Sequence, residues 1–420
     1  MPASDLLIWL IALASVACVM LRPRGWPEAV WAMLGAGALV AAGLLPIADA
    51  VRAVANGWDV YLFLIGMMFL SELARQEGLF DHMAASAARF AKGSAMRLFA
   101  LVYGVGVLVT VFLSNDATAV VLTPAVYAAA RAAGAAPQPY LFACAFIANA
   151  ASFVLPISNP ANLVVFGGRP PALMDWIALF GPASAASIVV TFAALRLVFG
   201  KDLRGRLDTP APPPPLSRGC RVAAFGLAGA VVVLLAASAF DVPLGLPTLV
   251  AGLATAAAML LAEGKGPVAL ARGISWSVLP LVAGLFIIVE ALARTGAIEA
   301  LAAQLGEAAR AYGDAPTSLA AGAITAFAVN LMNNLPAGLI AAKTLAATQP
   351  AASPLISGAV MIGVDLGPNL SVTGSLATIL WLLALRREGL RVGALRFLGV
   401  GALVMTPALV ASLAALVWFR

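Results

Sequence analysis

Apolar runs as long as a bilayer is thick recur along this chain. The stretches near 5–21, 173–199 and 397–418 each hold 17 or more residues, with charges only near their ends. A helix needs about 20 such residues to cross the hydrocarbon core of a membrane. Of the 420 residues, 62% are hydrophobic and 10% charged, too few polar groups to cover a soluble globule. We therefore expect an all-α polytopic membrane protein. The other runs lie near 29–46, 59–74, 98–130, 140–166, 222–240, 244–262, 275–292, 317–347 and 354–385.

Glycine and proline interrupt these runs more often than straight helices would require. The sequence holds 38 glycines and 27 prolines, residues that permit close helix contact or break the hydrogen-bond ladder of a membrane helix. Broken helices are therefore expected. The run near 5–21 has neither a basic segment before it nor a cleavage pattern after it, so we interpret it as a span and not as a signal peptide.

Cysteine and charge patterns argue against several classes of function. Cys18, Cys144 and Cys220 are dispersed and form no CxxC pair, which predicts neither a disulfide framework nor a metal site. No cofactor is expected. The net charge of +6 comes from basic residues in the loops between apolar runs. Membrane topology explains such a distribution better than nucleic-acid binding does.

The basic residues also predict an orientation. We interpret 98–130 and 317–347 as re-entrant hairpins that return to the side they left. Nineteen Lys and Arg residues, Lys265 among them, then fall on one side of the bilayer and six on the other. The positive-inside rule makes the basic-rich side cytoplasmic. This predicts a bacterial-type inner (plasma) membrane protein with both termini outside. The six outward residues are Arg52, Arg169, Arg294, Arg310, Lys343 and Arg420.

The two halves of the sequence resemble each other. A shift of 218 positions places Trp58 on Trp276, and it also aligns glutamate and asparagine residues further along. Chance readily matches alanines between two apolar halves, but not this combination of rarer residues. We therefore predict an internal repeat. The same shift aligns Glu72 with Glu290, Asn115 with Asn333, and Asp116 with Asn334.

The repeat predicts how the chain is divided. Residues 1–200 form the first repeat and 222–420 the second, joined by a proline-rich cytoplasmic linker at 201–221. Each repeat is expected to hold five transmembrane helices and one re-entrant hairpin. Five crossings are an odd number, so the second repeat begins on the opposite side and is inverted. Inverted repeats are typical of secondary transporters.

Each predicted hairpin carries a polar tip. "FLSNDATAVVLTP" places Ser-Asn-Asp between apolar runs, and "LMNNLPAG" is its counterpart in the second half. Non-helical backbone at membrane depth is tolerated only where protein buries it or where it lines a watery cavity. Asn and Asp can cap the returning helix and still present groups to a ligand. The candidate binding residues at the tips are Asn115, Asp116, Thr118, Asn333 and Asn334.

Two further runs carry polar breaks in mid-span. "LPISNPANLVVFGG" interrupts 140–166, and "VDLGPNLSVTGSLAT" interrupts 354–385, which predicts one broken helix per half. The four polar segments would meet at one site near the membrane midplane. The purely structural alternative is a set of proline kinks whose Ser and Thr side chains satisfy freed carbonyls. The candidates here are Ser158, Asn159, Asn369, Thr373 and Ser375.

Asp116 and Asp365 are the acids that we expect deepest in the membrane. Intramembrane ionisable residues are functional candidates by default, and a carboxyl that gains and loses a proton would suit a proton-coupled cycle. We favour proton coupling through at least one of them, Asp116 before Asp365. The alternative is that each carboxylate caps a broken helix and stays ionised.

Glu72 and Glu290 occupy equivalent places near the ends of paired spans. Each precedes an arginine, Arg75 or Arg294, so we expect an ion pair or hinge at each place and treat a substrate role as secondary. Lys343, near the outer end of the second hairpin, is expected to extend toward the membrane surface.

These segments resemble the arsenite permeases of the ArsB type. That group belongs to the ion transporter superfamily, which also holds sodium/proton antiporters and dicarboxylate carriers. The resemblance runs across nearly the whole chain, and "DLGP" followed by "GSLATILW" is its most specific part. The Ser-Asn-Asp tip is shared more widely within the superfamily.

The resemblance implies a function and a site. It implies alternating-access efflux of arsenite and antimonite, as As(OH)₃ and Sb(OH)₃, in exchange for protons. In some members a cytoplasmic ATPase subunit of the ArsA type is a partner. The hairpin tips and unwound helices would hold the substrate, at the candidate positions named above together with Asp365. Cys144, which precedes the first mid-span break, is a candidate for a single soft contact.

The residue chemistry agrees with a neutral hydroxylated solute. No arginine lies in any of the four polar segments. Amides and hydroxyls suit such a solute, whereas a dicarboxylate or phosphate usually requires arginine or bound cations. A silicic acid exporter and a sodium/proton antiporter of the same architecture remain alternatives.

Two readings from other classes are weaker. An intramembrane aspartyl protease needs two facing acids, but the repeat pairs Asp116 with Asn334 and Asp365 with Asn149. A passive membrane anchor for an ATPase would leave the polar breaks without a purpose.

Overall fold

Helices make up the regular structure of this protein. The computed structural model describes residues 2–263 and 267–419, and within them it contains helices and no strand beyond an isolated bridge between Ser94 and Arg206. Lys265 and Arg420, two of the residues that predict the orientation, lie outside the described residues.

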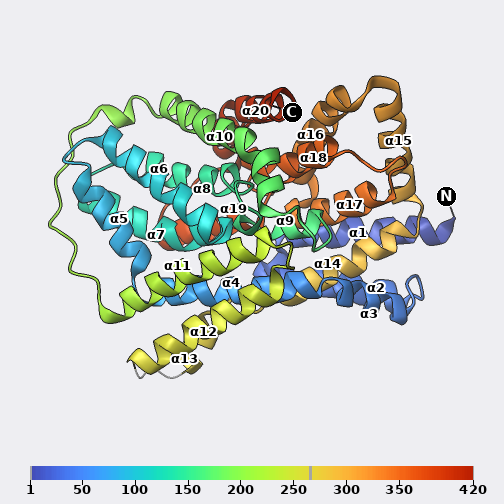
Figure 1. Cartoon of the computed structure of the whole chain (residues 1–420), viewed down its shortest axis with the longest axis horizontal. Helices are drawn as coiled ribbons and strands as arrows, with labels where there is room; N and C mark the ends of the chain where they lie inside the picture. Colours follow the sequence, from blue (N-terminus) through green and yellow to red (C-terminus); the bar gives the residue numbers. More distant parts are fainter. Residues whose placement is uncertain (1, 264–266, 420) are drawn as a thin grey trace.

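The helices fall into two similar series (Figure 1). Within the described residues, the first half contains α1 (Ala3–Leu21), α2 (Glu28–Ala41), α3 (Ile47–Asn56), α4 (Trp58–Gln76), α5 (Leu79–Phe90), α6 (Ala95–Phe112), α7 (Thr123–Ala132), α8 (Gln138–Ala150), α9 (Pro160–Val165) and α10 (Leu173–Val198). The second half contains α11 (Arg218–Ala239), α12 (Gly245–Glu263), α13 (Pro267–Gly273), α14 (Val278–Ala293), α15 (Ala297–Tyr312), α16 (Asp314–Met332), α17 (Asn334–Ala347), α18 (Pro354–Leu366), α19 (Leu376–Arg387) and α20 (Ala394–Trp418). Between them lie the π-helix η2 (Ala117–Leu122) and the 3₁₀ turns η1 (Pro23–Gly25), η3 (Pro156–Ser158), η4 (Asp202–Arg204) and η5 (Gly367–Asn369).

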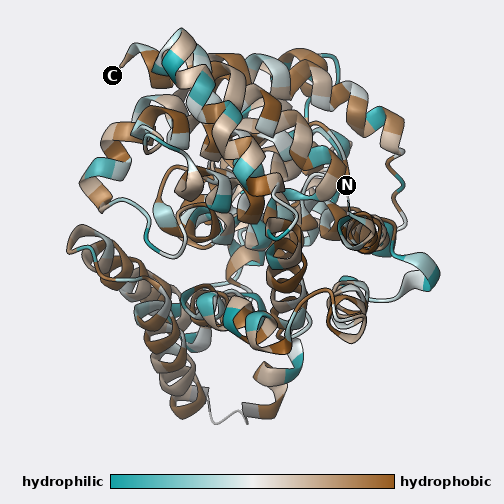
Figure 2. Ribbon diagram, turned by 90° about the vertical axis from the view of Figure 1, so that its right-hand side faces the viewer, coloured by the Kyte–Doolittle hydropathy of each residue, from teal (hydrophilic) through white to brown (hydrophobic). Residues whose placement is uncertain are grey.

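Many of these helices are suited to lipid. Within the described residues, seven are long and apolar enough to cross a membrane, or up to nine if two bent pairs, α3 with α4 and α14 with α15, count as single spans. Their outer faces are apolar: Leu13 on α1, Val232 on α11 and Leu403 on α20 are 60%, 66% and 64% exposed. Figure 2 shows that apolar residues, drawn in brown, run along much of the length of the outer helices. Soluble proteins rarely expose apolar surface on this scale, so the predicted all-α membrane fold class is confirmed.

The helices pack into two bodies (Figure 1). In the first, which we call the support body (α1–α4 and α11–α14), α4 packs on α12 and α2 on α14. In the second, the core bundle (α6–α10 and α16–α20), α16 packs on α18, α10 on α20 and α6 on α8. Helices α5 and α15 lead from the support body into the core bundle in each half.

Packing partners are exchanged between the halves. Helix α2 packs on α14 just as α12 packs on α4, and α9 packs on α17 just as α19 packs on α7. Such exchanged pairs are what two repeats related by a pseudo-two-fold axis produce. The inversion of the second repeat relative to the membrane stays a prediction.

The first hairpin starts and ends at one place. Two adjacent linker residues, Leu207 and Asp208, donate backbone hydrogen bonds to the carbonyls of Gly93 and Ala133, at 2.9 and 3.0 Å. Gly93 precedes α6 and Ala133 follows α7, so the two ends of the segment lie side by side. The chain therefore doubles back at its polar tip.

The second hairpin has the same geometry. Arg310, just before α16, donates to the carbonyl of Gln349, just after α17, at 2.8 Å. Helix α16 ends at Met332 and α17 begins at Asn334, so a single residue, Asn333, makes the turn.

Glycines allow the two halves to touch within the support body. A Cβ at Gly66 on α4 would overlap the carbonyl of Thr248 on α12, and a Cβ at Gly252 would lie 2.7 Å from the carbonyl oxygen of Gly66. Both obstacles are backbone atoms, which cannot rotate away as a side chain can. Small residues at such contacts let membrane helices approach closely.

We expect Gly66→Ala to separate α4 from α12 and to cost about 1–3 kcal/mol, the usual range for overpacking. The measurement is the thermal unfolding midpoint of the protein purified in detergent, which should fall. Gly229→Ala is the matched control, because a Cβ at Gly229 on α11 meets nothing within 4 Å. Equal midpoints for the two variants would contradict this close contact.

Candidate functional site

Polar side chains of the two broken helices meet inside the core bundle. Asn149, at the end of α8, donates from Nδ2 to Oδ1 of Asn369 in η5 at 2.9 Å. Asn369 donates in turn to the carbonyl of Phe146 at 2.9 Å. Both asparagines are 1% exposed or less, and the Oδ1 of Asn149 accepts no hydrogen bond from a described residue. The two halves are thus joined by amides, with one acceptor left over.

Asp365 joins the same two breaks. Its Oδ2 accepts a hydrogen bond from Ser152 Oγ at 2.6 Å, and its Oδ1 accepts one from Asn159 Nδ2 at 2.8 Å. The orientation of the Asn159 amide is fixed, because its Oδ1 accepts the backbone N–H of Ala161 at 3.0 Å and so caps α9. A flipped amide would lose both hydrogen bonds. The Asp365 side chain is fully buried. This carboxylate therefore holds α18 against the break that follows α8.

Each break is also tied to the hairpin of its own half. Ser158 Oγ donates to the carbonyl of Val111 on α6 at 2.9 Å. In the second half, Thr373 donates to the carbonyl of Asn330 on α16 at 3.0 Å, and Ser371 donates to its side-chain oxygen at 2.6 Å. Hydrogen bonds therefore connect the first hairpin, the two breaks and the second hairpin in one series.

The tip of the first hairpin is capped by its own side chains. Asn115 Oδ1 accepts the backbone N–H of Asp116 at 2.9 Å, and Ser114 Oγ accepts that of Ala117 at 3.1 Å. Thr118 and Thr110 join the two arms through their hydroxyls at 2.8 Å. The Asp116 carboxylate makes no hydrogen bond or ion pair with another described residue, and this residue is partly exposed. The returning arm begins as the π-helix η2, a form found frequently at functional sites.

The tip of the second hairpin is strained. Asn333 has φ 77° and ψ 155°, a region that suits glycine and costs other residues about 1–3 kcal/mol. Its Oδ1 accepts the N–H of Leu335 at 3.3 Å. Asn333 and Asn334 are 5% and 4% exposed, and Asn333 lines a narrow cavity with Glu28 and Leu376. A strained residue that faces a cavity is a candidate for function.

Other polar side chains in the breaks satisfy the backbone. Ser375 Oγ accepts the N–H of Thr378 at 3.1 Å and so caps α19. Asn162 donates to three carbonyls between 152 and 156, at 2.9 to 3.3 Å. These side chains satisfy backbone groups freed at the breaks, as the purely structural alternative expects.

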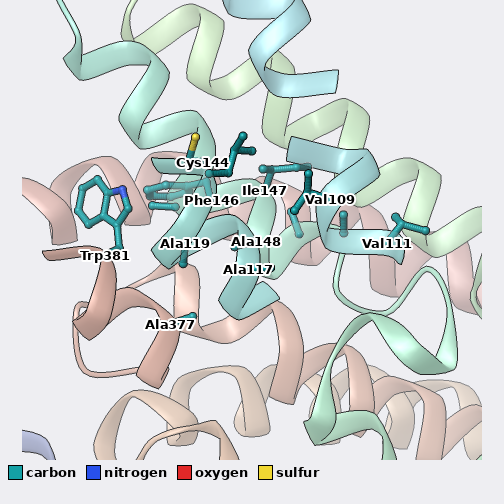
Figure 3. Packing of buried hydrophobic residues seen from close by; sticks show 14 of the residues in the cluster. Val109, Val111, Ala117, Ala119, Cys144, Phe146, Ile147, Ala148, Ala377 and Trp381 are labelled. Carbon is teal, nitrogen blue, oxygen red and sulfur yellow. The ribbon is translucent and has the colours of Figure 1, made fainter. Parts of the chain in front are cut away.

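Cys144 lies in apolar packing. The residue is fully buried, and Figure 3 shows it among Phe146, Ile147 and Trp381. This environment does not favour the predicted soft contact with arsenic, which stays a prediction.

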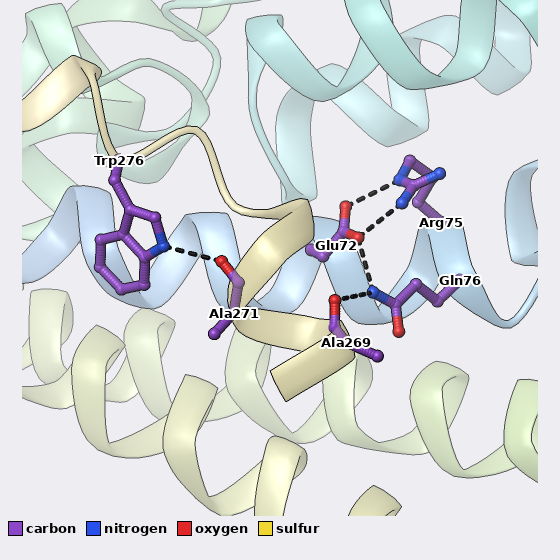
Figure 4. A network of polar contacts seen from close by, with 6 residues as sticks. All are labelled: Glu72, Arg75, Gln76, Ala269, Ala271 and Trp276. Carbon is purple, nitrogen blue, oxygen red and sulfur yellow. Dashed lines mark hydrogen bonds and ion pairs between the residues drawn. The ribbon is translucent and has the colours of Figure 1, made fainter. Parts of the chain in front are cut away.

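Glu72 forms the ion pair expected of it. Arg75 binds its carboxylate with two nitrogens at 2.6 and 2.7 Å, and Gln76 donates to the same carboxylate at 2.7 Å (Figure 4). Gln76 also donates to the carbonyl of Ala269 at 3.2 Å, which ties α4 to α13. These contacts therefore stay within α4 and between α4 and α13.

Glu290 also forms the expected ion pair, but its partner is not the arginine that follows it. Glu290 pairs with Lys343 on α17 at 2.7 Å, and Arg294 pairs with Asp49 on α3. Asp49 is a buried acid beside α14 and therefore attracts the arginine. Lys343 thus pairs with a carboxylate on α14, and its extension toward the membrane surface stays a prediction.

Sequence reasoning missed Ser152, Asn330 and Glu28 as site residues. Asn330 is a polar residue inside an apolar helix, three positions before the tip, and that signal was available. Ser152 is a small residue of a kind common in membrane helices. Nothing in the sequence indicates that Glu28, at the start of α2, lines the same small cavity as Asn333, some 300 positions later.

Comparison with known proteins identifies the family. Residues 10–364 match the model of the family described as citrate transporter (CitMHS), which covers most of the chain. The chain belongs to this family. It is therefore a multi-pass membrane transporter and not an enzyme.

Relatives and solved structures agree with this assignment. The arsenical pump membrane protein of Escherichia coli is 28% identical over 423 residues, covering 98% of both chains. Together with the family match, this confirms the resemblance to ArsB-type permeases. The YdaH transporter of Alcanivorax borkumensis has a similar fold, with a TM-score of 0.60 and 17% identity over 99% of this chain and 98% of that one. MtrF of Neisseria gonorrhoeae has a TM-score of 0.56 and 15% identity over 100% and 95%. At these identities the two structures show the fold alone.

We expect Asp365→Ala to destabilise the core bundle, because it leaves the buried Asn159 amide without its acceptor, at a cost of about 1–3 kcal/mol. Asp365→Asn keeps one oxygen for Asn159 and can donate to Ser152, whose hydroxyl also lies 2.7 Å from the carbonyl of Asn149. The thermal midpoint in detergent should therefore fall for alanine and stay near wild type for asparagine. Equal losses would show that the charge of Asp365, and not its hydrogen bonds, stabilises the bundle.

Proposed function

We propose that this protein exports arsenite and antimonite, as As(OH)₃ and Sb(OH)₃, in exchange for protons by alternating access. The observation that carries the proposal is the chemistry of the four polar segments at 114–118, 149–162, 330–334 and 365–378. They present amides and hydroxyls and contain no Lys or Arg. A neutral trihydroxide can donate to and accept from such groups. The E. coli relative named an arsenical pump supports the same substrate class.

Asn149 and the hairpin tips are the proposed contacts for the solute. The unpaired Oδ1 of Asn149 is an acceptor for a solute hydroxyl. Asn115 and Asn333 bring amide groups to the two tips. These contacts need no charge on the protein, which matches a neutral solute.

Asp116 is the proposed proton carrier. A carrier must exchange protons with water, and Asp116 is partly exposed with no hydrogen-bond partner for its carboxylate among the described residues. Asp365 is fully buried, and both of its oxygens already accept hydrogen bonds. We therefore assign Asp365 a positioning role and leave proton exchange to Asp116.

Citrate is the second candidate substrate, because the family description names it. Carboxylates usually recruit arginine or bound cations, and the polar segments contain neither Arg nor Lys. Silicic acid, another neutral hydroxide, and sodium, which Asp116 and Asp365 would bind, are the remaining alternative substrates. The proposal also includes an inner-membrane location with both termini outside. An ArsA-type cytoplasmic ATPase is the proposed partner.

Arsenite accumulation in everted vesicles tests the substrate and its coupling. With a proton gradient imposed, vesicles that contain the protein should accumulate arsenite, and an uncoupler should abolish the accumulation. Excess antimonite should compete, and excess citrate should not. Accumulation of citrate or silicic acid in place of arsenite would overturn the substrate assignment.

Asp116→Asn should reduce arsenite accumulation to the level measured with the uncoupler, because the amide cannot carry a proton. Asp365→Asn is the matched control and should retain gradient-driven accumulation, since its hydrogen bonds can be remade. The reverse result would assign proton coupling to Asp365.

Asn333 offers a way to separate side chain from backbone. Asn333→Gly removes the side chain and relieves the strained φ, whereas Asn333→Ala removes the side chain and keeps the strain. If the amide contacts the solute, both variants should raise KM for arsenite about two- to tenfold, the effect of one neutral hydrogen bond. A wild-type KM in the glycine variant would mean that Asn333 serves only the turn.

A further inference from the structure

A cavity of about 230 Å³ lies between the two bodies, lined by Ala53 on α3, Phe286 on α14, Ala342 on α17 and Gly167 just after α9. This volume exceeds that of several water molecules, at about 30 Å³ each. Helix α3 lies at the end of the molecule opposite to the loop that carries the proline-rich linker (Figure 1). The cavity is therefore large enough for a small solute and lies on the side away from the linker.

An ion pair in the wall of this cavity connects the two bodies. Lys343 Nζ lies 2.7 Å from Glu290 Oε2, and both residues line the cavity. Glu290 belongs to α14 of the support body, and Lys343 belongs to α17 of the core bundle. Their side chains are 27% and 36% exposed. An ion pair with this much exposure is weak, which suits a contact that must open and close repeatedly.

The bridge exists because Glu290 is not paired along its own helix. Residues four apart on a helix are neighbours, so Arg294 is within reach of Glu290. Arg294 instead pairs with Asp49 on α3, which also pairs with Arg52. The equivalent acid of the first half, Glu72, is satisfied within α4 (Figure 4). Only the second-half acid is thus available to reach across to a hairpin.

The cavity ends where α9 packs on α17. Val164 and Leu339 line it, and each lies five residues beyond a polar helix start, at Asn159 or Asn334. With a rise of 1.5 Å per residue, Val164 and Leu339 lie about 7.5 Å along their helices from those starts. At this end of the cavity α9 and α17 are in contact, since a Cβ at Gly338 would lie 3.5 Å from the Val164 side chain. A movement of α17 would join the cavity to the polar breaks.

We propose that Glu290 and Lys343 form a gate on this side of the transporter. When paired, they hold α17 against α14 and keep α9 and α17 closed. When α17 moves away from both α14 and α9, the pair separates and the solute passes between the breaks and the cavity. The gate rests on the alternating-access part of the proposed function, and it does not depend on which solute is carried.

A cysteine at the closed end of the cavity, where α9 meets α17, reports the opening of the gate without any substrate. In a variant whose three native cysteines are replaced by serine, Leu339→Cys is labelled with a membrane-impermeant maleimide, in intact cells and in everted vesicles. Adding Glu290→Gln or Lys343→Met should raise the labelling rate about two- to fivefold from one side only, the range for a partly exposed ion pair. The exchanged pair, Glu290→Lys with Lys343→Glu, should return the rate to that of the parent.

Glu72→Gln is the matched control, because it breaks an ion pair of the same kind that stays within α4. It should leave labelling of the Leu339 reporter unchanged. Unchanged rates in both gate variants, an equal rise in the Glu72 variant, or failure of the exchanged pair to restore the rate would each overturn the gate. Either single variant suffices if the other does not fold, as judged by size exclusion in detergent.

The labelling experiment and the transport assay test the gate and the proposed function separately. If vesicles accumulate no arsenite but labelling responds as expected, the substrate assignment falls and the gate stands. If arsenite accumulates but labelling does not respond, the gate falls and the proposed function stands.

Discussion

A helix that breaks inside a membrane leaves polar groups that lipid cannot hydrogen-bond, and in this protein the two broken helices satisfy each other. Asn149 bonds Asn369, and Asp365 accepts from Ser152 and Asn159, all between the two halves. Each half alone would leave these buried groups unpaired, at a cost of about 1–3 kcal/mol apiece. The two broken helices are therefore also what joins the two halves of the chain.

This constraint gives the two deep acids different environments. Asp365 lies where the breaks cross, so its oxygens are used to join them. Asp116 lies at a hairpin tip whose backbone is already capped by Asn115 and Ser114, so its carboxylate is left without a partner in the described structure. Two acids in polar breaks of the same protein can thus differ in chemistry, because tertiary contacts decide which of their oxygens already accept hydrogen bonds.

Charged residues between the bodies follow a related rule. A buried acid needs an oppositely charged partner. Asp49 on α3 is such an acid, and Arg294 pairs with it instead of with Glu290, which lies four residues earlier. Glu290 then bridges to Lys343, while Glu72 keeps its arginine. One displaced arginine is enough to turn a local ion pair into a contact between bodies.

The sequence by itself determined the helical membrane class, the positions of nearly all long helices, the two turning points and the two mid-span breaks. Apolar length, proline and glycine carry that information locally. It also indicated which polar residues lie in the breaks, because such residues are costly in a membrane and therefore stand out. Only the tertiary structure decided which of them bond to each other, that Ser375 caps a helix, that Asn330 joins the site and that Glu290 pairs with Lys343. Those choices depend on distances between segments up to some 220 positions apart, and a one-dimensional pattern holds no record of them.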